Sequence, residues 1–233
     1  MLTIALVYPE LLGTYGDGGN ALVLGERARR RGIDAEVLRV GIGDDLPDAS
    51  IYLLGGGEDG PQRLGAELLR ESSFASRVND GRFVFAVCAG LQLLGTTFAV
   101  EGDDEFEGLG LVPAVTHRGP TRSVGDLVVT ARISVLVGFE NHGGRTTLDA
   151  NISPFGTVEV GRGNDGVVDG FRTENIWATY AHGPVLAINP WLADAILSRV
   201  LDRELEPLAS VADELYAERR ATVYHSAASG RRP

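Results

Sequence analysis

The stretch FVFAVCAGLQLL, residues Phe83–Leu94, decides the fold. Five apolar residues, Phe83–Val87, lead directly into Cys88, and the small residues Ala89 and Gly90 precede a helix-like run. A short apolar run bounded by turn residues is typical of a strand that is buried on both faces of a parallel sheet. The stretch therefore predicts a buried strand, a tight turn at Cys88 and a helix.

Cys88 is the only cysteine of the chain, and its position permits two interpretations. A nucleophile on a strand-to-helix turn is exposed at the carboxyl edge of the sheet, where the first helical N–H groups stabilise a thiolate. A lone cysteine is, however, more often a structural residue, because a free thiol packs like a small apolar side chain.

The composition is that of an ordinary globular protein. The 233 residues are 44% hydrophobic and 23% charged, enough for one large α/β domain or two small ones. The net charge of −11 argues against nucleic acid or an anionic membrane as the main partner. A single cysteine excludes internal disulfides and fits the cytoplasm. We expect neither a signal peptide nor membrane insertion, because the sequence has no pattern for either.

Strand and helix patterns alternate in the first half and become strand-rich in the second. The predicted strands are Thr3–Tyr8, Ala35–Val40, Ile51–Leu54, Phe83–Val87, Leu109–Thr116, Leu127–Arg132, Val135–Phe139, Gly156–Val160, Val167–Phe171 and Trp177–Tyr180, with turns at Gly143–Gly144 and Gly161–Gly166. The predicted helices are Ala21–Arg31 with Asn20 as its N-cap, Gln62–Val78, the segment after Cys88, Pro190–Leu205 and Ala209–Arg220, before a frayed tail over Ser226–Pro233.

This order indicates an α/β fold: an open, mainly parallel sheet with helices on both faces and an antiparallel extension of the same sheet in the second half. Ligands are expected at the carboxyl ends of the strands. We expect one domain over residues 1–205, followed by a C-terminal helix and tail over residues 206–233.

Two histidines stand near predicted strand ends. His182 follows the strand Trp177–Tyr180 and reaches the same edge as Cys88, where it could be the base that a thiol needs or a histidine bonded to a nearby carbonyl. His142, in GFENHGGRT, could line the site but is more typical of a turn residue that holds Gly143–Gly144. His117 and His225 are predicted on the surface.

Other candidate residues are ambiguous singly. Gly55–Gly57 offers backbone N–H groups that could form an oxyanion hole with Ala89, bind a phosphate or simply allow a turn. Arg122 could bind a carboxylate, although most loop arginines are only solvated. The acidic run Glu101–Glu107 predicts a solvated loop, and its spacing fits no metal site.

The combination of Gly55–Gly57, the C-A-G-L-Q sequence that begins at Cys88 and the late His182 resembles the class I glutamine amidotransferases, which have a flavodoxin-like fold. In their commonest branch a glutamate two residues after the histidine orients it. Here that position is Pro184, as in the cobyric-acid-synthase-like branch. Within that branch, TYGDGGN, GFENHGGRT and TYAHGP are similar to the glutaminase subunits of lipid II isoglutaminyl synthases, from about Leu2 to Leu205.

The resemblance implies that the chain hydrolyses L-glutamine through a thioester on Cys88, with His182 transferring protons. The implied substrate-binding residues are Arg122 and Gln92, and the implied oxyanion-hole residues are Gly56, Gly57 and Ala89. Ammonia would pass to a Mur-ligase-like, ATP-dependent synthetase in a heterodimer, which amidates the D-glutamate α-carboxylate of lipid II in peptidoglycan synthesis. ATP and metal are expected on that partner, and neither a cofactor nor a metal in this chain.

The third member of the triad, which orients His182, would come from the partner or be absent. Isolated chain would then have weak glutaminase activity that the partner restores. Other functions stay open: a glutaminase for another acceptor, such as a corrinoid acid, a non-catalytic binding or redox protein of the same fold, and a cysteine hydrolase of the intracellular-peptidase type.

Overall fold

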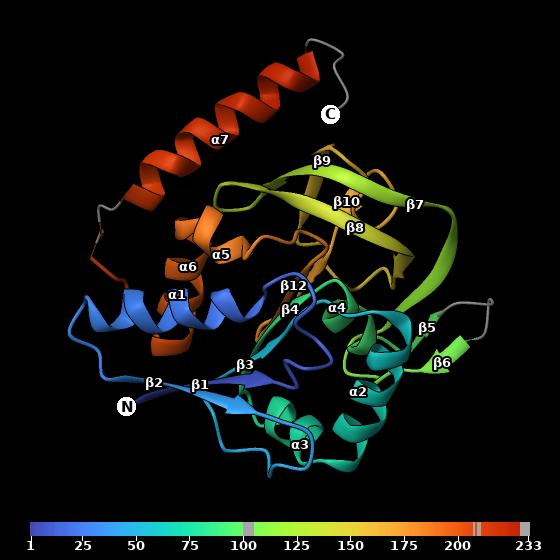
Figure 1. The fold of residues 1–233 in the computed structure, drawn as a ribbon, viewed down its shortest axis with the longest axis vertical. Coiled ribbons are helices and arrows are strands. Elements are labelled where there is room, and N and C mark those ends of the chain that lie inside the picture. Colours follow the sequence, from blue (N-terminus) through green and yellow to red (C-terminus); the bar gives the residue numbers. More distant parts are fainter. Residues whose placement is uncertain (100–104, 207, 209–210, 229–233) are drawn as a thin grey trace.

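The computed structural model describes residues 1–99, 105–206, 208 and 211–228, and two six-stranded sheets form its framework (Figure 1). The first sheet has the strand order β11-β12-β4-β3-β1-β2. Its strands are β1 (Leu2–Val7), β2 (Ala35–Val40), β3 (Ile51–Leu54), β4 (Phe83–Val87), β11 (Phe171–Arg172) and β12 (Ile176–Thr179). All of them run parallel except β11, which pairs antiparallel with β12 at the edge. The predicted parallel α/β sheet is confirmed.

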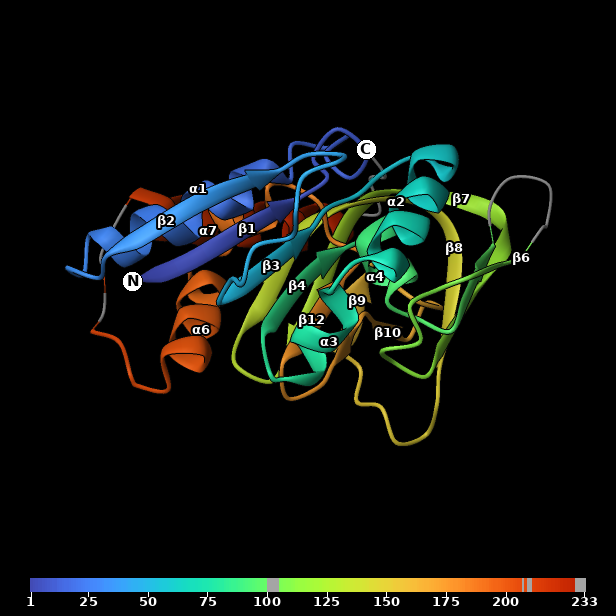
Figure 2. The ribbon, with the colours of Figure 1, turned by 90° about the horizontal axis from the view of Figure 1, so that it is seen from below.

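Helices cover both faces of this sheet (Figures 1 and 2). α1 (Gly18–Arg29) and α6 (Pro190–Leu201) pack against each other on one face, and α2 (Asp59–Glu71), α3 (Phe74–Asn79) and α4 (Ala89–Leu93) lie on the other. Every residue of β3, β4 and β12 is buried. Burial on both faces explains why these strands are unbroken apolar runs instead of alternating patterns.

Most strand pairs of the second half are antiparallel, as predicted, but apart from β11 and β12 these strands form a second sheet instead of lengthening the first. That sheet contains β5 (Thr97–Ala99), β6 (Glu105–Glu107), β7 (Ala114–Ala131), β8 (Val135–Leu148), β9 (Gly156–Val160) and β10 (Val168–Asp169). The predicted strand Val167–Phe171 is divided between the sheets at Gly170. Gly170 has a φ of 54°, and a Cβ there would lie 1.8 Å from the Ala178 carbonyl oxygen, so only glycine permits this crossing.

The long β7–β8 hairpin accounts for two further differences from the sequence prediction. The predicted strands Leu109–Thr116 and Leu127–Arg132 contribute to the single strand β7, which begins only at Ala114. The predicted turn at Gly143–Gly144 lies inside β8. Alternating polar residues show that both strands are partly solvated. Glycine is uncommon inside strands, so Gly143–Gly144 was predicted to form a turn.

Two predicted helix boundaries also change. The predicted helix Gln62–Val78 is interrupted at Ser72, whose backbone is extended and whose hydroxyl donates to the Leu69 carbonyl and accepts from the Phe74 N–H. Such local side-chain bonding competes with helix continuation. Asn20 lies inside α1 rather than at its N-cap, and its side-chain oxygen accepts the N–H of Leu186 at 2.9 Å. This bond ties α1 to α5 (Val185–Ile188).

The helix α7 (Val211–Ala228) lies along the second sheet (Figure 1). Tyr216 donates its hydroxyl hydrogen to the Val135 carbonyl at 2.7 Å, and Val223 packs against Val128 and Val137. The helix extends beyond the predicted Ala209–Arg220 into the predicted tail, while residues 209–210 and 229–233 lie outside the described residues. Within the described part of the chain, no helix combines the length and apolarity needed to cross a membrane.

A partly buried ion pair joins α1 to α6 and provides a test of this packing. Arg27 donates from Nε and Nη2 to the two carboxylate oxygens of Asp194, at 2.6 Å each, and Arg31 adds a bond of 2.9 Å. We expect Asp194→Asn to lower the free energy of unfolding by about 2 kcal/mol, because buried guanidinium groups lose a charged partner. Urea denaturation measures the change.

Glu26→Gln is the matched control. Glu26 pairs with Arg30 at 2.8 Å on the exposed face of the same helix, so its loss should cost less than about 0.5 kcal/mol. Equal effects of the two variants would contradict the assigned role of Asp194.

Candidate active site

The backbone of Cys88 has a φ of 50°, a value that few residues other than glycine adopt. Its N–H donates to the Thr179 carbonyl at 3.0 Å, and two residues later the Gly90 N–H donates to the Gly55 carbonyl at 3.0 Å. These bonds fix the turn between β4 and α4 against the ends of β12 and β3. A strained turn of this kind presents the side chain at the sheet edge, and the predicted elbow is present.

His182 follows β12 and lies at the same edge as Cys88. Its backbone pairs with Phe139 of β8, so it belongs to both sheets. Its ring is buried, and Nδ1 lies 3.8 Å from Oδ2 of Asp17, which is also buried. That separation is an ion-pair distance and exceeds a hydrogen bond. Burial alone would lower the pKa of His182, but its interactions with Asp17 and Cys88 outweigh burial and raise the pKa to about 9.

The glycine loop Gly55–Gly57 lies directly against this pair. A Cβ at Gly56 would lie 2.6 Å from Cε1 of His182, so the loop approaches the imidazole as closely as only glycine allows. The Gly56 N–H donates to Oδ2 of Asp17 at 2.7 Å. Because the Gly56 N–H is bonded to Asp17, the Gly57 and Ala89 N–H groups are the candidate oxyanion donors. The N–H of Ala89 is the first of α4 and has no partner within the helix.

A cavity of about 190 Å³ brings together residues that are far apart in the sequence. Gly57, Cys88, Gln92, Arg122 and Asn141 are among its lining residues. A larger cavity of about 340 Å³ opens at the amino ends of the strands, around Leu2 and Phe83, and contains none of the predicted site residues. The smaller cavity is therefore the candidate active site, because the predicted site residues line it.

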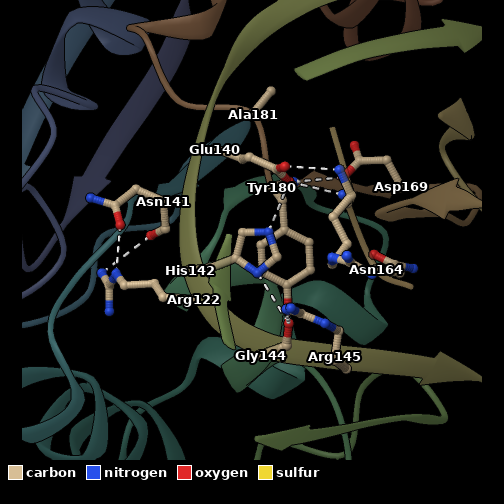
Figure 3. A network of polar contacts seen from close by, with 12 residues as sticks. Arg122, Glu140, Asn141, His142, Gly144, Arg145, Asn164, Asp169, Tyr180 and Ala181 are labelled. Carbon is tan, nitrogen blue, oxygen red and sulfur yellow. Dashed lines mark hydrogen bonds and ion pairs between the residues drawn. The ribbon is translucent and has the colours of Figure 1, made fainter. Parts of the chain in front are cut away.

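Arg122 reaches this cavity from β7 of the second sheet. Its Nε donates to Oδ1 of Asn141 at 2.6 Å (Figure 3). Its Nη2 lies 3.4 Å from the hydroxyl oxygen of Tyr15. Asn141 in turn donates to Tyr15 at 3.0 Å. The guanidinium is thus held in place by groups from β8 and from the loop after β1, which favours the recognition of an anion.

Gln92 lines the cavity with its side-chain amide held at both ends. Its Nε2 donates to the Tyr180 hydroxyl at 3.0 Å, and its Oε1 accepts from Gln62 at 2.8 Å. The Tyr180 hydroxyl also bonds Thr146 at 2.7 Å. Burial raises the pKa of Tyr180, so the phenol stays neutral.

His142 supports the cavity wall from inside β8, instead of standing in a turn (Figure 3). Its ring stacks on Tyr180 with centroids 3.9 Å apart, and its Nε2 lies 3.1 Å from Glu140. Glu140 also accepts the N–H groups of Arg162 and Gly163, at 2.8 and 2.9 Å. Burial lowers the pKa of His142, although Glu140 opposes this effect.

Two further sequence candidates, His117 and the described part of the acidic run, are not among the residues that line this cavity. His117 is exposed and lies 3.1 Å from Glu105, and the side chain of His225 is outside the described residues. Of the acidic run Glu101–Glu107, residues 101–104 are outside the described range, and the rest form β6. Across the described ranges, no group of three or more His, Cys, Asp or Glu side chains is arranged to hold a metal ion.

Sequence reasoning missed several polar residues of the site: Tyr15, Asp17, Glu140, Asn141 and Asp169. Tyr15 and Asp17 belong to TYGDGGN, which follows β1. Because the carboxyl ends of parallel strands meet at one edge, this polar loop could have been placed beside Cys88. Glu140 and Asn141 belong to GFENHGGRT, but their place beside the cavity depends on the path of the second sheet.

The sequence matches the family of CobB/CobQ-like glutamine amidotransferase domains over residues 3–190. It is 31% identical to the glutamine-hydrolysing subunit GatD of lipid II isoglutaminyl synthase from Staphylococcus aureus, over 87% of this chain and 86% of that protein. It is 34% identical to GatD from Streptococcus pneumoniae, over 87% of this chain and 82% of that protein. Identity to cobyric acid synthase from Sphingopyxis alaskensis is 32%, over 71% of this chain but 35% of that protein.

Solved structures agree on the fold. One crystal structure of a glutamine amidotransferase covers 84% of this chain, with a TM-score of 0.58 and 20% identity. Another, from Thermotoga maritima, covers 95% with a TM-score of 0.53 and 14% identity. At these identities the likeness concerns the fold alone.

The buried carboxylate of Asp169 provides a test of the support behind Cys88. It accepts hydrogen bonds from the Thr179 hydroxyl at 2.5 Å and from the Tyr180 N–H at 3.1 Å, and Thr179 is the residue whose carbonyl accepts the Cys88 N–H. Burial raises the pKa of Asp169 to about 7, although these two bonds oppose it. The folded protein therefore binds this proton more tightly than the unfolded chain does.

The contribution of Asp169 to the free energy of unfolding should therefore fall as the pH rises from 3.8, the ordinary pKa of the carboxyl, to about 7. Above that range the contribution should no longer change with pH. Asp169→Asn removes the titration. We expect the difference in unfolding free energy between Asp169→Asn and wild type to shift in favour of the variant as the pH rises from about 5 to about 8. Urea denaturation at several pH values measures it, and a difference independent of pH would contradict the prediction.

Proposed function

Because this chain belongs to the CobB/CobQ-like glutamine amidotransferase family, we propose that it hydrolyses L-glutamine in the cavity shared by Cys88 and Arg122. The observation that carries the proposal is the Cys88 elbow, with its φ of 50° and with a buried His182 interacting with it. A strained backbone is retained at a nucleophile because it aims the side chain at the substrate.

Substrate binding starts at Arg122. Its guanidinium forms paired hydrogen bonds with the α-carboxylate of glutamine, a geometry that suits a planar fork. Asn141 and Tyr15 already hold the guanidinium, which reduces the entropy lost on binding. The side chain of glutamine then extends toward Cys88, past the anchored amide of Gln92.

The thiolate of Cys88 attacks the side-chain amide carbon of glutamine and forms a C–S bond. The N–H groups of Gly57 and Ala89 stabilise the oxyanion that develops. When this intermediate collapses, the C–N bond breaks and protonated His182 gives its proton to the leaving nitrogen, so that ammonia forms. His182 then takes a proton from water as the water oxygen attacks the thioester carbon; the C–S bond breaks, glutamate leaves, and the thiolate and protonated His182 are restored.

The acceptor of ammonia belongs to a partner. The two GatD proteins match this chain over most of their own length, whereas cobyric acid synthase matches over about a third of its length. This favours a glutaminase subunit in a heterodimer with an ATP-dependent, Mur-ligase-like synthetase. In the cytoplasm, that partner would use the ammonia to amidate the D-glutamate α-carboxylate of lipid II, and would hold the ATP and metal.

A glutaminase for a corrinoid acid is the second candidate, because the match to cobyric acid synthase is similar in identity to the other two. Co-purification separates the candidates: the ligase that accompanies this chain from its own cell identifies the acceptor. Recovery of a corrinoid-acid synthetase in place of a Mur-ligase-like protein would overturn the lipid II assignment.

Cys88→Ala should reduce ammonia release from glutamine by about a thousandfold or more, since the thioester cannot form. Intact-mass analysis should find one molecule of an electrophilic glutamine analogue on wild type and none on the variant. Because the chain has a single cysteine, the label reports this residue alone. A wild-type protein that binds its synthetase yet neither takes the label nor releases ammonia would be a non-catalytic relative.

Arg122→Lys should raise the KM for glutamine by about ten- to a hundredfold with a much smaller change in kcat, because a lysine cannot fork to a carboxylate. Arg118→Lys is the matched comparison, since Arg118 lines the same cavity. If the KM rises in Arg118→Lys and not in Arg122→Lys, the carboxylate is bound by the other arginine.

A further inference from the structure

Asp17 is a buried carboxylate with no role in the reaction steps proposed above. It lies in the loop after β1, two residues after Tyr15, and its side chain is 1% exposed. One oxygen, Oδ2, accepts the Gly56 N–H at 2.7 Å and lies 3.8 Å from Nδ1 of His182. A buried charge is costly unless it is paired, and the ring of His182 is the cationic partner at this distance.

Several polar atoms of Asp17 and His182 have no hydrogen-bond partner among the described residues. Oδ1 of Asp17 and both ring nitrogens of His182 are buried and have no hydrogen-bond partner within the part of the chain that the structure describes. Unsatisfied buried polar atoms are rare and point to a functional role. Catalytic hydrogen bonds are often long in the absence of substrate and tighten when it binds, so a shift of under an ångström would join Asp17 to Nδ1.

The loop that carries Asp17 is clamped onto the segment that carries His182. The Tyr15 ring contacts the imidazole with centroids 4.3 Å apart. On the other side of Asp17, Asn20 accepts the N–H of Leu186, and a Cβ at Gly19 would lie 2.3 Å from Cγ of Pro184. The spacing between the carboxylate and the ring is therefore set by backbone packing on both sides.

We propose that Asp17 is the positioning residue of the site: it holds Nδ1 of His182 toward itself and leaves Nε2 directed at Cys88. It also supports the imidazolium that forms when the thiol proton is transferred. Through Gly56 it fixes the glycine loop relative to the same ring. The carboxylate therefore comes from the loop after the first strand of this chain, in the role that a glutamate two residues after the histidine would have, where Pro184 stands here.

This proposal rests on the proposed glutaminase function, and the test uses Asp17→Asn in the full chain, assayed together with its co-purified synthetase. Asparagine keeps the acceptor for the Gly56 N–H and removes the charge. We expect kcat for glutamine hydrolysis to fall by at least about a hundredfold with a nearly unchanged KM, because the base is misoriented while the Arg122 subsite is intact.

A second readout separates positioning from general structural support. The titratable groups that face His182 in the described residues are Asp17, Cys88 and Tyr15. Loss of the Asp17 charge removes one of the interactions that hold the pKa of His182 at about 9, so the pKa should fall by about one unit or more. Histidine NMR titration, assigned with His182→Gln, measures this pKa without any need for glutamine.

Asp44→Asn is the matched control, because Asp44 also accepts a backbone N–H, from Gly41 at 2.8 Å, but is exposed and outside the site. It should change neither kcat nor the titration of His182. A folded Asp17→Asn protein with wild-type kcat and wild-type His182 titration would overturn the proposal.

Two further outcomes are distinguishable. If Asp17→Asn does not fold, the wild-type titration still decides: a His182 pKa at or below the ordinary value of about 6.5 would overturn the pairing. If wild type releases no ammonia and takes no glutamine analogue, the glutaminase function fails, while the His182 titration in both proteins still confirms or rejects the role of Asp17 in holding the imidazole.

Discussion

The positive φ of Cys88 is the constraint on which the rest of the site depends. An L-residue keeps such a backbone only where the surrounding contacts offset the strain. Here β4 lies between β3 and β12, and both neighbours contribute carbonyls that accept N–H groups of the turn, from Gly55 and from Thr179. The apolar sequence that buries β4 on both faces is thus also what holds the thiol at the sheet edge.

The chemistry is divided between two sheets that meet at this edge. The first sheet supplies Cys88, the glycine loop and the loop with Asp17, whereas the second supplies Arg122 and Asn141. In the proposed reaction, this division separates bond breaking from substrate recognition. It also explains why the cavity is polar and small: it is bounded by backbone groups and by side chains that already bond one another.

Sequence patterns predicted the first sheet well, because continuous burial leaves a strong apolar signal at Phe83–Val87 and its neighbours. They predicted the edge position of His182 for the same reason. They failed where tertiary contacts decide: Gly143–Gly144 lies in a strand because β7 pairs with it, and Ser72 interrupts a helix through its own side-chain bonds. The position of Asp17 beside His182 was not predicted, because two residues that are distant in sequence leave no spacing to recognise.

The backbone pairing of His182 with Phe139 has a mechanical consequence. Hydrogen bonds of 2.7 and 3.4 Å make the end of β12 and the middle of β8 one rigid unit, so a displacement of the hairpin at Phe139 moves the imidazole by a similar amount. The backbone N–H of Cys88, in contrast, donates to Thr179 of the first sheet. The distance between the imidazole of His182 and the thiol of Cys88 therefore depends on the relative position of the two sheets.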